Sequence, residues 1–232
     1  GEIYLPPQNA IYGVYVDSLG QKVGLKDGDR IVGVNGEQLE RFEQLSTDII
    51  LNEAKTIDIL RDGRPVSLSV PQGTIRSLIR RKGIPLAYPK YPAVVDSISK
   101  EAKFTSGALQ KNDQIIALNG IPIGSYIEFQ DKKSRFKNAE VTITVLRNEK
   151  DTVQVRAKLN EKAGVGFYAR SSRKFLKYAT KEFTFLESLP AGVAKGWEML
   201  VMNVQNFKLL FTSKEVKASE SLGSFLSIGD MF

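Results

Sequence analysis

The stretch Gly24-Leu25-Lys26-Asp27-Gly28-Asp29-Arg30-Ile31-Val32-Gly33-Val34-Asn35-Gly36 returns in altered form as Ala108-Leu109-Gln110-Lys111-Asn112-Asp113-Gln114-Ile115-Ile116-Ala117-Leu118-Asn119-Gly120. The two copies stay in register at a constant offset of 84 positions. Self-similarity at a fixed offset indicates a structural unit that has been built twice. The 232 residues leave room for two such units of ordinary size and an additional segment.

Each copy predicts a turn, a strand and a tight turn. Gly28 and Asn112 occupy the same slot, and both residue types readily take a positive φ. The slot is followed by an apolar, β-branched run, which is typical of a buried strand. Both runs end in Asn-Gly, the strongest short signal for a hairpin.

The match extends beyond the central stretch in both directions. Residues 15–18 parallel residues 94–97 upstream, and residues 58–62 and 66–70 parallel residues 144–148 and 153–157 downstream. The small changes in offset correspond to loop insertions, which cost little. Between the hairpin and the last strands, apolar spacing predicts one helix in each copy, roughly 41–52 and 126–136.

This order of elements around Gly-Leu-x-x-Gly-Asp-x-Ile-x-x-Val-Asn-Gly resembles the PDZ domain of bacterial proteases. The second copy departs from the pattern at Asn112, a change that preserves the turn. The resemblance implies an α+β, mostly β fold class: two tandem PDZ domains, each a small, partly open β-barrel with a groove helix, followed by a C-terminal amphipathic helix. The expected divisions are 1–74 for the first PDZ domain, 75–169 for the second with its leading strand, 170–188 for a connecting segment, and 189–232 for the amphipathic helix and a membrane-proximal tail.

The segment that joins the two copies has its own pattern. Residues 74–82 predict a short helix, and Pro85, Pro89 and Pro92 then force an extended path. We expect this path to supply the leading strand of the second domain, and residues 2–7 to do the same for the first. Residues 164–169 predict a final strand.

Histidine and cysteine are both absent from the chain. A Ser-His-Asp triad, a Cys-His pair and a His-x-x-x-His zinc pair are therefore excluded. No acidic cluster has the spacing of a calcium loop. We expect no catalytic residue, no metal site and no cofactor in this chain.

The net charge of +7 is concentrated in three basic clusters. They are Arg76, Arg80, Arg81 and Lys82; Lys132, Lys133, Arg135 and Lys137; and Arg170, Arg173, Lys174, Lys177 and Lys181. Such clusters are typical of solvated faces, and they also suit anionic lipid headgroups. Because no stacking aromatics are interleaved with them and no nucleic-acid motif is present, nucleic acid is not an expected partner.

A continuous apolar helix face is predicted near the C-terminus. Its residues recur at steps of four and three: Val193, Trp197, Leu200, Val204, Phe207 and Phe211. Charged and amide side chains on the other side argue against a transmembrane span and indicate an amphipathic helix. This helix either packs on a PDZ core or, as we favour, docks on the membrane or a partner.

The whole arrangement resembles one family. Tandem PDZ domains, a helix with Trp197-Glu198-Met199 and the tail Ser221-Leu222-Gly223-Ser224-Phe225-Leu226-Ser227-Ile228 are similar to the extracytoplasmic region of a bacterial RseP-type site-2 protease, the regulator-of-sigma-E protease. The family tail usually reads Leu-Gly-Gly-Pro-Ile-Ser-Ile, whereas Ser224 and Phe225 stand here in place of Gly and Pro. The chain opens at Gly1-Glu2 without an initiator Met, which indicates an excised fragment.

The resemblance implies that the parent is an enzyme, although the fragment is not. Family members are inner-membrane zinc metalloproteases that cut transmembrane anti-sigma factors and remnant signal peptides. Their zinc ligands come from a His-Glu-x-x-His motif and a Leu-Asp-Gly motif, neither of which is present here. The fragment would lie on the periplasmic face of the inner membrane. Its implied partners are transmembrane protein substrates, membrane spans of the same polypeptide and anionic lipid.

For this region the resemblance implies substrate gating by size rather than chemistry. An extended peptide can pair with the edge of a PDZ strand beside its helix. The expected groove residues are Tyr12, Gly13, Val14, Tyr15, Val16, Leu45 and Ile49 in the first copy, and Ala93, Val94, Val95, Asp96, Ile127 and Phe129 in the second. Two alternatives remain: a peptide-binding PDZ pair of a periplasmic serine protease, and a non-enzymatic scaffold.

Overall fold

The structure, a computed structural model, describes residues 1–82 and 84–182, and this part of the chain is mostly β. The strands are β1 (Glu2–Tyr4), β2 (Val14–Val16), β3 (Arg30–Val34), β4 (Glu37–Gln38), β5 (Thr56–Arg61), β6 (Arg64–Ser69), β7 (Ala87–Pro89), β8 (Val95–Ile98), β9 (Phe104–Ser106), β10 (Gln114–Leu118), β11 (Ile121–Pro122), β12 (Glu140–Arg147), β13 (Asp151–Lys158), β14 (Phe167–Ala169) and β15 (Ala179–Lys181). The α-helices are α1 (Ser18–Val23), α2 (Leu45–Leu51), α3 (Thr74–Arg80) and α4 (Tyr126–Lys133). Short 3₁₀ helices span Pro7–Asn9, Phe42–Gln44 and Ser172–Lys174.

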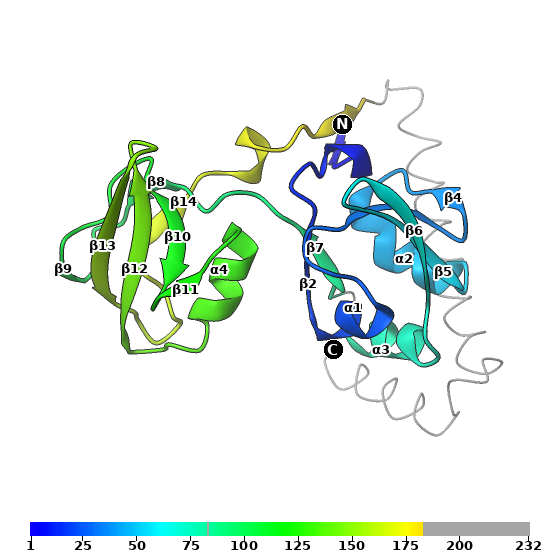
Figure 1. Cartoon of the computed structure of the whole chain (residues 1–232), viewed down its shortest axis with the longest axis horizontal. Coiled ribbons are helices and arrows are strands. Elements are labelled where there is room, and N and C mark those ends of the chain that lie inside the picture. The colour runs from blue at the N-terminus through cyan, green and yellow to red at the C-terminus, as the bar shows by residue number, and fades with distance from the viewer. Residues whose placement is uncertain (83, 183–232) are drawn as a thin grey trace, which may run out of the picture.

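The two sequence copies build two equivalent units, which Figure 1 shows side by side. The sheet of the first unit has the order β4-β3-β5-β6, and that of the second has the order β11-β10-β12-β13-β9. The central strand pairs even share an irregularity, since the register shifts between Ile31 and Gly33 in β3 and between Ile115 and Ala117 in β10. The duplication predicted from sequence is therefore confirmed.

The predicted turns have the backbone that their residues favour. Gly28 has φ of 91° and Asn112 has φ of 73°, so the shared slot is left-handed in both units. The two Asn-Gly pairs also lie at positive φ, which joins β3 to β4 and β10 to β11 as tight hairpins.

Each unit has its own hydrophobic core. In the first unit the predicted helix is a 3₁₀ turn followed by α2, and Phe42, Leu45 and Ile49 are buried there. In the second unit α4 buries Phe129 and ends at Lys133, three residues before the predicted end at 136. The helix predictions are confirmed in place, with shorter ends.

A buried ion pair recurs at the same place in both units. The Asp29 carboxylate accepts two bonds of 2.8 Å from Arg61, and the Asp113 carboxylate accepts two of 2.8 Å from Arg147. Each aspartate also accepts a backbone N–H three residues earlier, which fixes the turn that precedes the central strand. The two carboxylates are 2% and 1% exposed, so the arginines compensate charges that water cannot reach.

The segment between the two sheets belongs to the first unit. The predicted short helix is present as α3. The leading-strand prediction is wrong, because β7 pairs antiparallel with β2. The physical reason is apolar burial: Leu78, Leu86 and Ala87 are at most 1% exposed and complete the first core.

The chain then comes back to its starting point. Residues 170–181, the return segment, run from the second unit to β1, where β15 pairs antiparallel with β1 (Figure 1). Leu176 is 2% exposed within the first core, and Asn9 Nδ2 donates to the Lys177 carbonyl at 2.6 Å. The β1 strand is thus held by this late segment, rather than leading the first sheet as expected.

Candidate functional site

The structure closes the strand edge predicted for a peptide in the first unit. On one side of β2, Val14 exchanges backbone bonds with Gly28 and Asp29 at 2.8 and 2.9 Å. On the other side β2 pairs with β7 over its whole length. Because both edges of Val14–Val16 are occupied, these residues offer no free edge, and peptide binding at residues 12–16 stays a prediction. Leu45 and Ile49, expected to line the groove, are core residues at 2% and 0% exposed.

In the second unit both edges of β8 are likewise occupied. The Val95 amide and carbonyl bond the Asp113 carbonyl and the Asn112 amide, at 2.9 and 2.8 Å. The opposite side of β8 pairs with β14. Ala93, Val94 and Val95 are therefore buried, and Asp96 is exposed without standing on an open edge.

The outermost strands of these pairs are β7 and β14, and they differ in what they offer. Among the described residues neither has a second strand partner. Because the bonding direction alternates along a strand, the backbone groups of Ala87 and Pro89 face away from β2. Ala87 is 1% exposed and proline has no N–H, so this edge cannot accept a strand.

Among the described residues the outer edge of β14 is unpaired, and β14 lies beside α4. The Gly166 carbonyl and the Arg170 amide bond β8 and its neighbouring loop, so alternation turns the amides of Phe167 and Ala169 outward. The Phe167 ring lies 6.0 Å from the ring of Phe129, and Tyr168 is 65% exposed. The sequence predicts a strand at residues 164–169 but not its partner, since β8 lies about 70 residues earlier in the chain.

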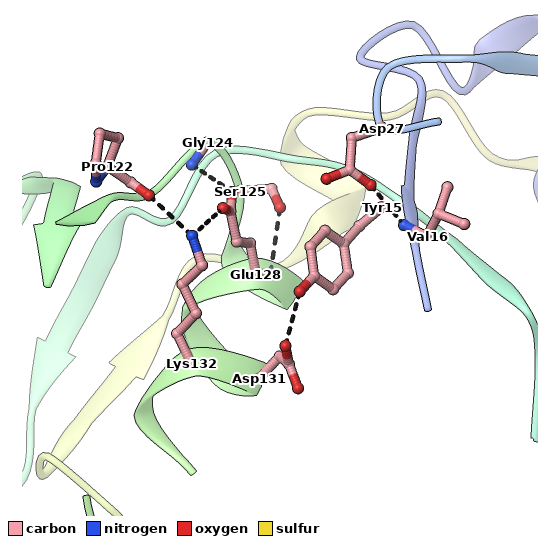
Figure 2. A network of polar contacts seen from close by, with 9 residues as sticks. All are labelled: Tyr15, Val16, Asp27, Pro122, Gly124, Ser125, Glu128, Asp131 and Lys132. Atoms are coloured by element: carbon pink, nitrogen blue, oxygen red, sulfur yellow. Dashed lines mark hydrogen bonds and ion pairs between the residues drawn. The ribbon is translucent and has the colours of Figure 1, made fainter. Parts of the chain in front are cut away.

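A polar contact joins the two units. The Tyr15 hydroxyl, from β2, donates to Asp131 Oδ2 on α4 at 2.7 Å (Figure 2). Burial and this hydrogen bond to the Asp131 carboxylate raise the pKa of Tyr15 well above its usual value of 10. The phenol therefore stays protonated at neutral pH and remains a donor across the junction.

Hydrogen bonds of neighbouring residues fix the backbone on both sides of this contact, as Figure 2 shows. Asp27 accepts the Val16 amide at 2.8 Å and fixes β2 beside Tyr15. At the start of α4, the Glu128 carboxylate accepts the Gly124 amide at 2.7 Å and pairs with Lys132 at 2.6 Å. The contact thus joins two rigid elements rather than two free side chains.

Aromatic packing reinforces the junction. The Tyr91 ring lies 5.6 Å from Tyr126 on α4 and 6.2 Å from Phe175 of the return segment. The Tyr91 carbonyl accepts the Tyr126 amide at 2.8 Å. Burial is the main reason that the pKa of Tyr91 is raised to about 12.

A cleft of about 590 Å³ lies where the units and the return segment meet. It includes the predicted residues Tyr12 and Val94, and Arg170 and Phe175 of the return segment. Its lining mixes amides, one carboxylate, one guanidinium, one phenol and apolar side chains.

The remaining predicted site lies elsewhere in the chain. The amphipathic helix with Val193, Trp197, Leu200, Val204, Phe207 and Phe211 falls outside the described residues. Within residues 1–82 and 84–182, no helix has the length and apolar character needed to cross a membrane. In the same ranges no group of three or more acidic residues is arranged to hold a metal ion.

Comparison with known proteins finds a similarity of low identity over most of the chain. No protein-family model matches the chain. A protein of Treponema pallidum (strain Nichols) named "Putative zinc metalloprotease" is 23% identical to it over 214 residues. The match covers 88% of this chain and 46% of that protein, so the chain spans about half the length of this relative.

Proposed function

We propose that the chain is the non-catalytic, periplasmic tandem-PDZ region of a membrane-embedded site-2 zinc metalloprotease of the RseP type. In this proposal it gates the access of transmembrane protein substrates, such as anti-sigma factors or remnant signal peptides, to an active site elsewhere in the polypeptide. The observation that carries it is the similarity to a named zinc metalloprotease, which covers most of this chain but about half of that protein.

The residues present do not fit a zinc centre. Zinc in proteins is bound by histidine, cysteine and carboxylate ligands, and this chain has neither His nor Cys. The described ranges also lack a suitable acidic cluster. The zinc of the proposed parent would be held by other parts of the polypeptide, and the role of this chain is limited to binding and exclusion.

The junction supports exclusion by size. Tyr15, Tyr91 and the return segment hold the two units in one relative orientation. We expect the cleft between the two units to accept an extended segment and to exclude a folded domain, because closely packed side chains do not yield continuously.

The test is a cleavage assay with the full-length protease and a membrane-anchored substrate, with and without a folded periplasmic domain. Tyr15→Phe combined with Asp131→Asn removes the inter-unit hydrogen bond, and we expect it to raise cleavage of the substrate that keeps its domain. Asp151→Asn, at the exposed start of β13, is the matched control and leaves the discrimination unchanged. Gating is refuted when the double variant discriminates as strictly as the native protease.

A second candidate, a peptide-binding module of a serine protease or scaffold, is favoured by the open β14 edge beside Phe129. Titration with free C-terminal peptides separates it from steric gating. For a peptide-binding module we expect saturable binding that is lost in Ala169→Pro, which removes an outward N–H, and kept in Tyr168→Ala. An absence of binding favours the steric filter.

A further inference from the structure

We propose that the return segment is a membrane-contact surface that binds anionic phospholipid headgroups through Arg173, Lys174 and Lys177. This inference rests on the proposed position beside a membrane, and it identifies the face of the described chain that lies against the lipid.

The segment carries a high density of positive charge. Between residues 170 and 181 the sequence contains five basic residues and no acidic one. Arg173, Lys174 and Lys177 are exposed, and in the described part of the chain none of these three side chains pairs with a carboxylate.

The backbone of the segment is fixed, which presents these cations as a surface. Leu176 is buried in the first core, and Phe175 and Tyr178 pack against it from the same segment. Ser172 and Tyr178 share a hydrogen bond of 3.0 Å, and the 3₁₀ turn bonds the Phe175 and Leu176 amides to the Ser172 carbonyl. Since the apolar side chains point inward, the charged ones project into solvent with little freedom left to lose on binding.

Exposed apolar residues lie on the elements that touch the return segment. Ile3 is 46% exposed and is opposite Thr180 in the β1–β15 pair. Ile11 is 58% exposed and lies two residues after Asn9, which donates to the Lys177 carbonyl. Cations together with exposed apolar side chains suit a headgroup layer, which is anionic outside and apolar beneath.

The charge of the return segment points to the same occupant. The segment carries five basic residues and no acidic one, and it leads into the β1–β15 pair (Figure 1). A basic residue within a Debye length of an anionic bilayer gains about 1 kcal/mol from its surface potential.

The test is co-sedimentation of the whole 232-residue chain with phosphatidylcholine vesicles that contain or lack phosphatidylglycerol. Arg173→Gln, Lys174→Gln and Lys177→Gln are combined in one variant, and we expect its partition onto anionic vesicles to fall about 100-fold, from about 1 kcal/mol per cation. The matched control combines Lys103→Gln, Lys137→Gln and Lys158→Gln, which removes the same charge from the second unit and changes the partition less than about threefold. Circular dichroism verifies that both variants are folded.

Three results would overturn the inference. In the first, the triple variant partitions onto anionic vesicles like the native chain. In the second, the control variant loses as much partition as the triple variant. In the third, the partition of the native chain does not depend on phosphatidylglycerol. Tighter, steeply salt-dependent binding to a DNA duplex would instead assign the cations to nucleic acid. A negative vesicle result together with a positive cleavage assay would remove the lipid surface and leave the gating proposal intact.

Discussion

Removing one arginine from the second unit should cost about as much stability as removing a large core side chain. In Arg147→Met the aliphatic stem is kept, and the Asp113 carboxylate loses two hydrogen bonds of 2.8 Å. That carboxylate is 1% exposed, so it stays buried with one backbone amide as its remaining partner. Breaking a buried pair in this way costs about 3–5 kcal/mol. Because the Arg147 side chain is 19% exposed and water can enter at that position, we expect about 3 kcal/mol.

Urea unfolding followed by circular dichroism measures this loss. About 3 kcal/mol corresponds to a fall of roughly 12–24 °C in the Tm of a unit of this size. The matched control is Arg156→Met, which breaks an ion pair of 3.9 Å whose side chains are 61% and 45% exposed. We expect the control to cost less than about 1 kcal/mol.

The duplication supplies an internal replicate. Arg61→Met removes the same two bonds from Asp29 in the first unit, so its loss should match that of Arg147→Met within about 1 kcal/mol. Equal losses of stability in Arg147→Met and Arg156→Met would show that the buried Asp113 carboxylate does not depend on its guanidinium partner.

Three further predictions concern the turns, the junction and the return segment. Gly28→Asn should cost under about 1 kcal/mol in urea unfolding, because Asn occupies the equivalent position in the second unit. Gly13→Ala should prevent stable folding, because its Cβ would lie 2.4 Å from the Gly28 carbonyl oxygen. Equal effects of the two substitutions would contradict this. The pKa values of Tyr15 and Tyr91 are raised in the fold, to about 12 for Tyr91, so the protonated phenols contribute stability that is fully present below pH 10. This contribution should be lost as the pH rises from 10 through about 12. A tyrosinate absorbance titration with normal midpoints for both residues would refute it. Leu176→Ala should destabilise the first unit by about 2–5 kcal/mol and leave the second unchanged, which hydrogen exchange resolved by unit can measure; a loss confined to the second unit would contradict the packing.

Local pattern was enough to predict the repeated centre of each unit. The Asn-Gly hairpins, the left-handed slot at Gly28 and Asn112, and the buried faces of α2 and α4 each depend on residues close in sequence. The corresponding chemistry is turn geometry and helical periodicity, both of which a single sequence carries.

The strand edges could not be predicted in the same way. The partner of β2 is β7, and the partner of β8 is β14, so each pairing joins segments separated by most of a unit. Apolar alternation identifies a strand but does not specify its neighbour. For the same reason the expected groove residues were assigned to strands whose edges are already paired.

The return segment was hidden because its pattern is irregular. Phe175, Leu176 and Tyr178 lie among lysines and arginines without helical or strand periodicity, and only the fold shows that they reach the first core. The Tyr15–Asp131 contact gave no signal either, since a lone tyrosine and a lone aspartate are common on surfaces.

The burial of Leu176 in the first core determines when the first unit can finish folding during synthesis. Synthesis proceeds from the N-terminus, and domains usually fold as they emerge. Here the first unit emerges with a gap that a residue following the entire second unit must fill, and β1 waits equally long for β15. The nascent first unit is therefore incomplete until translation has passed Lys181, and a ribosome stalled within the second unit would expose it to proteases and chaperones.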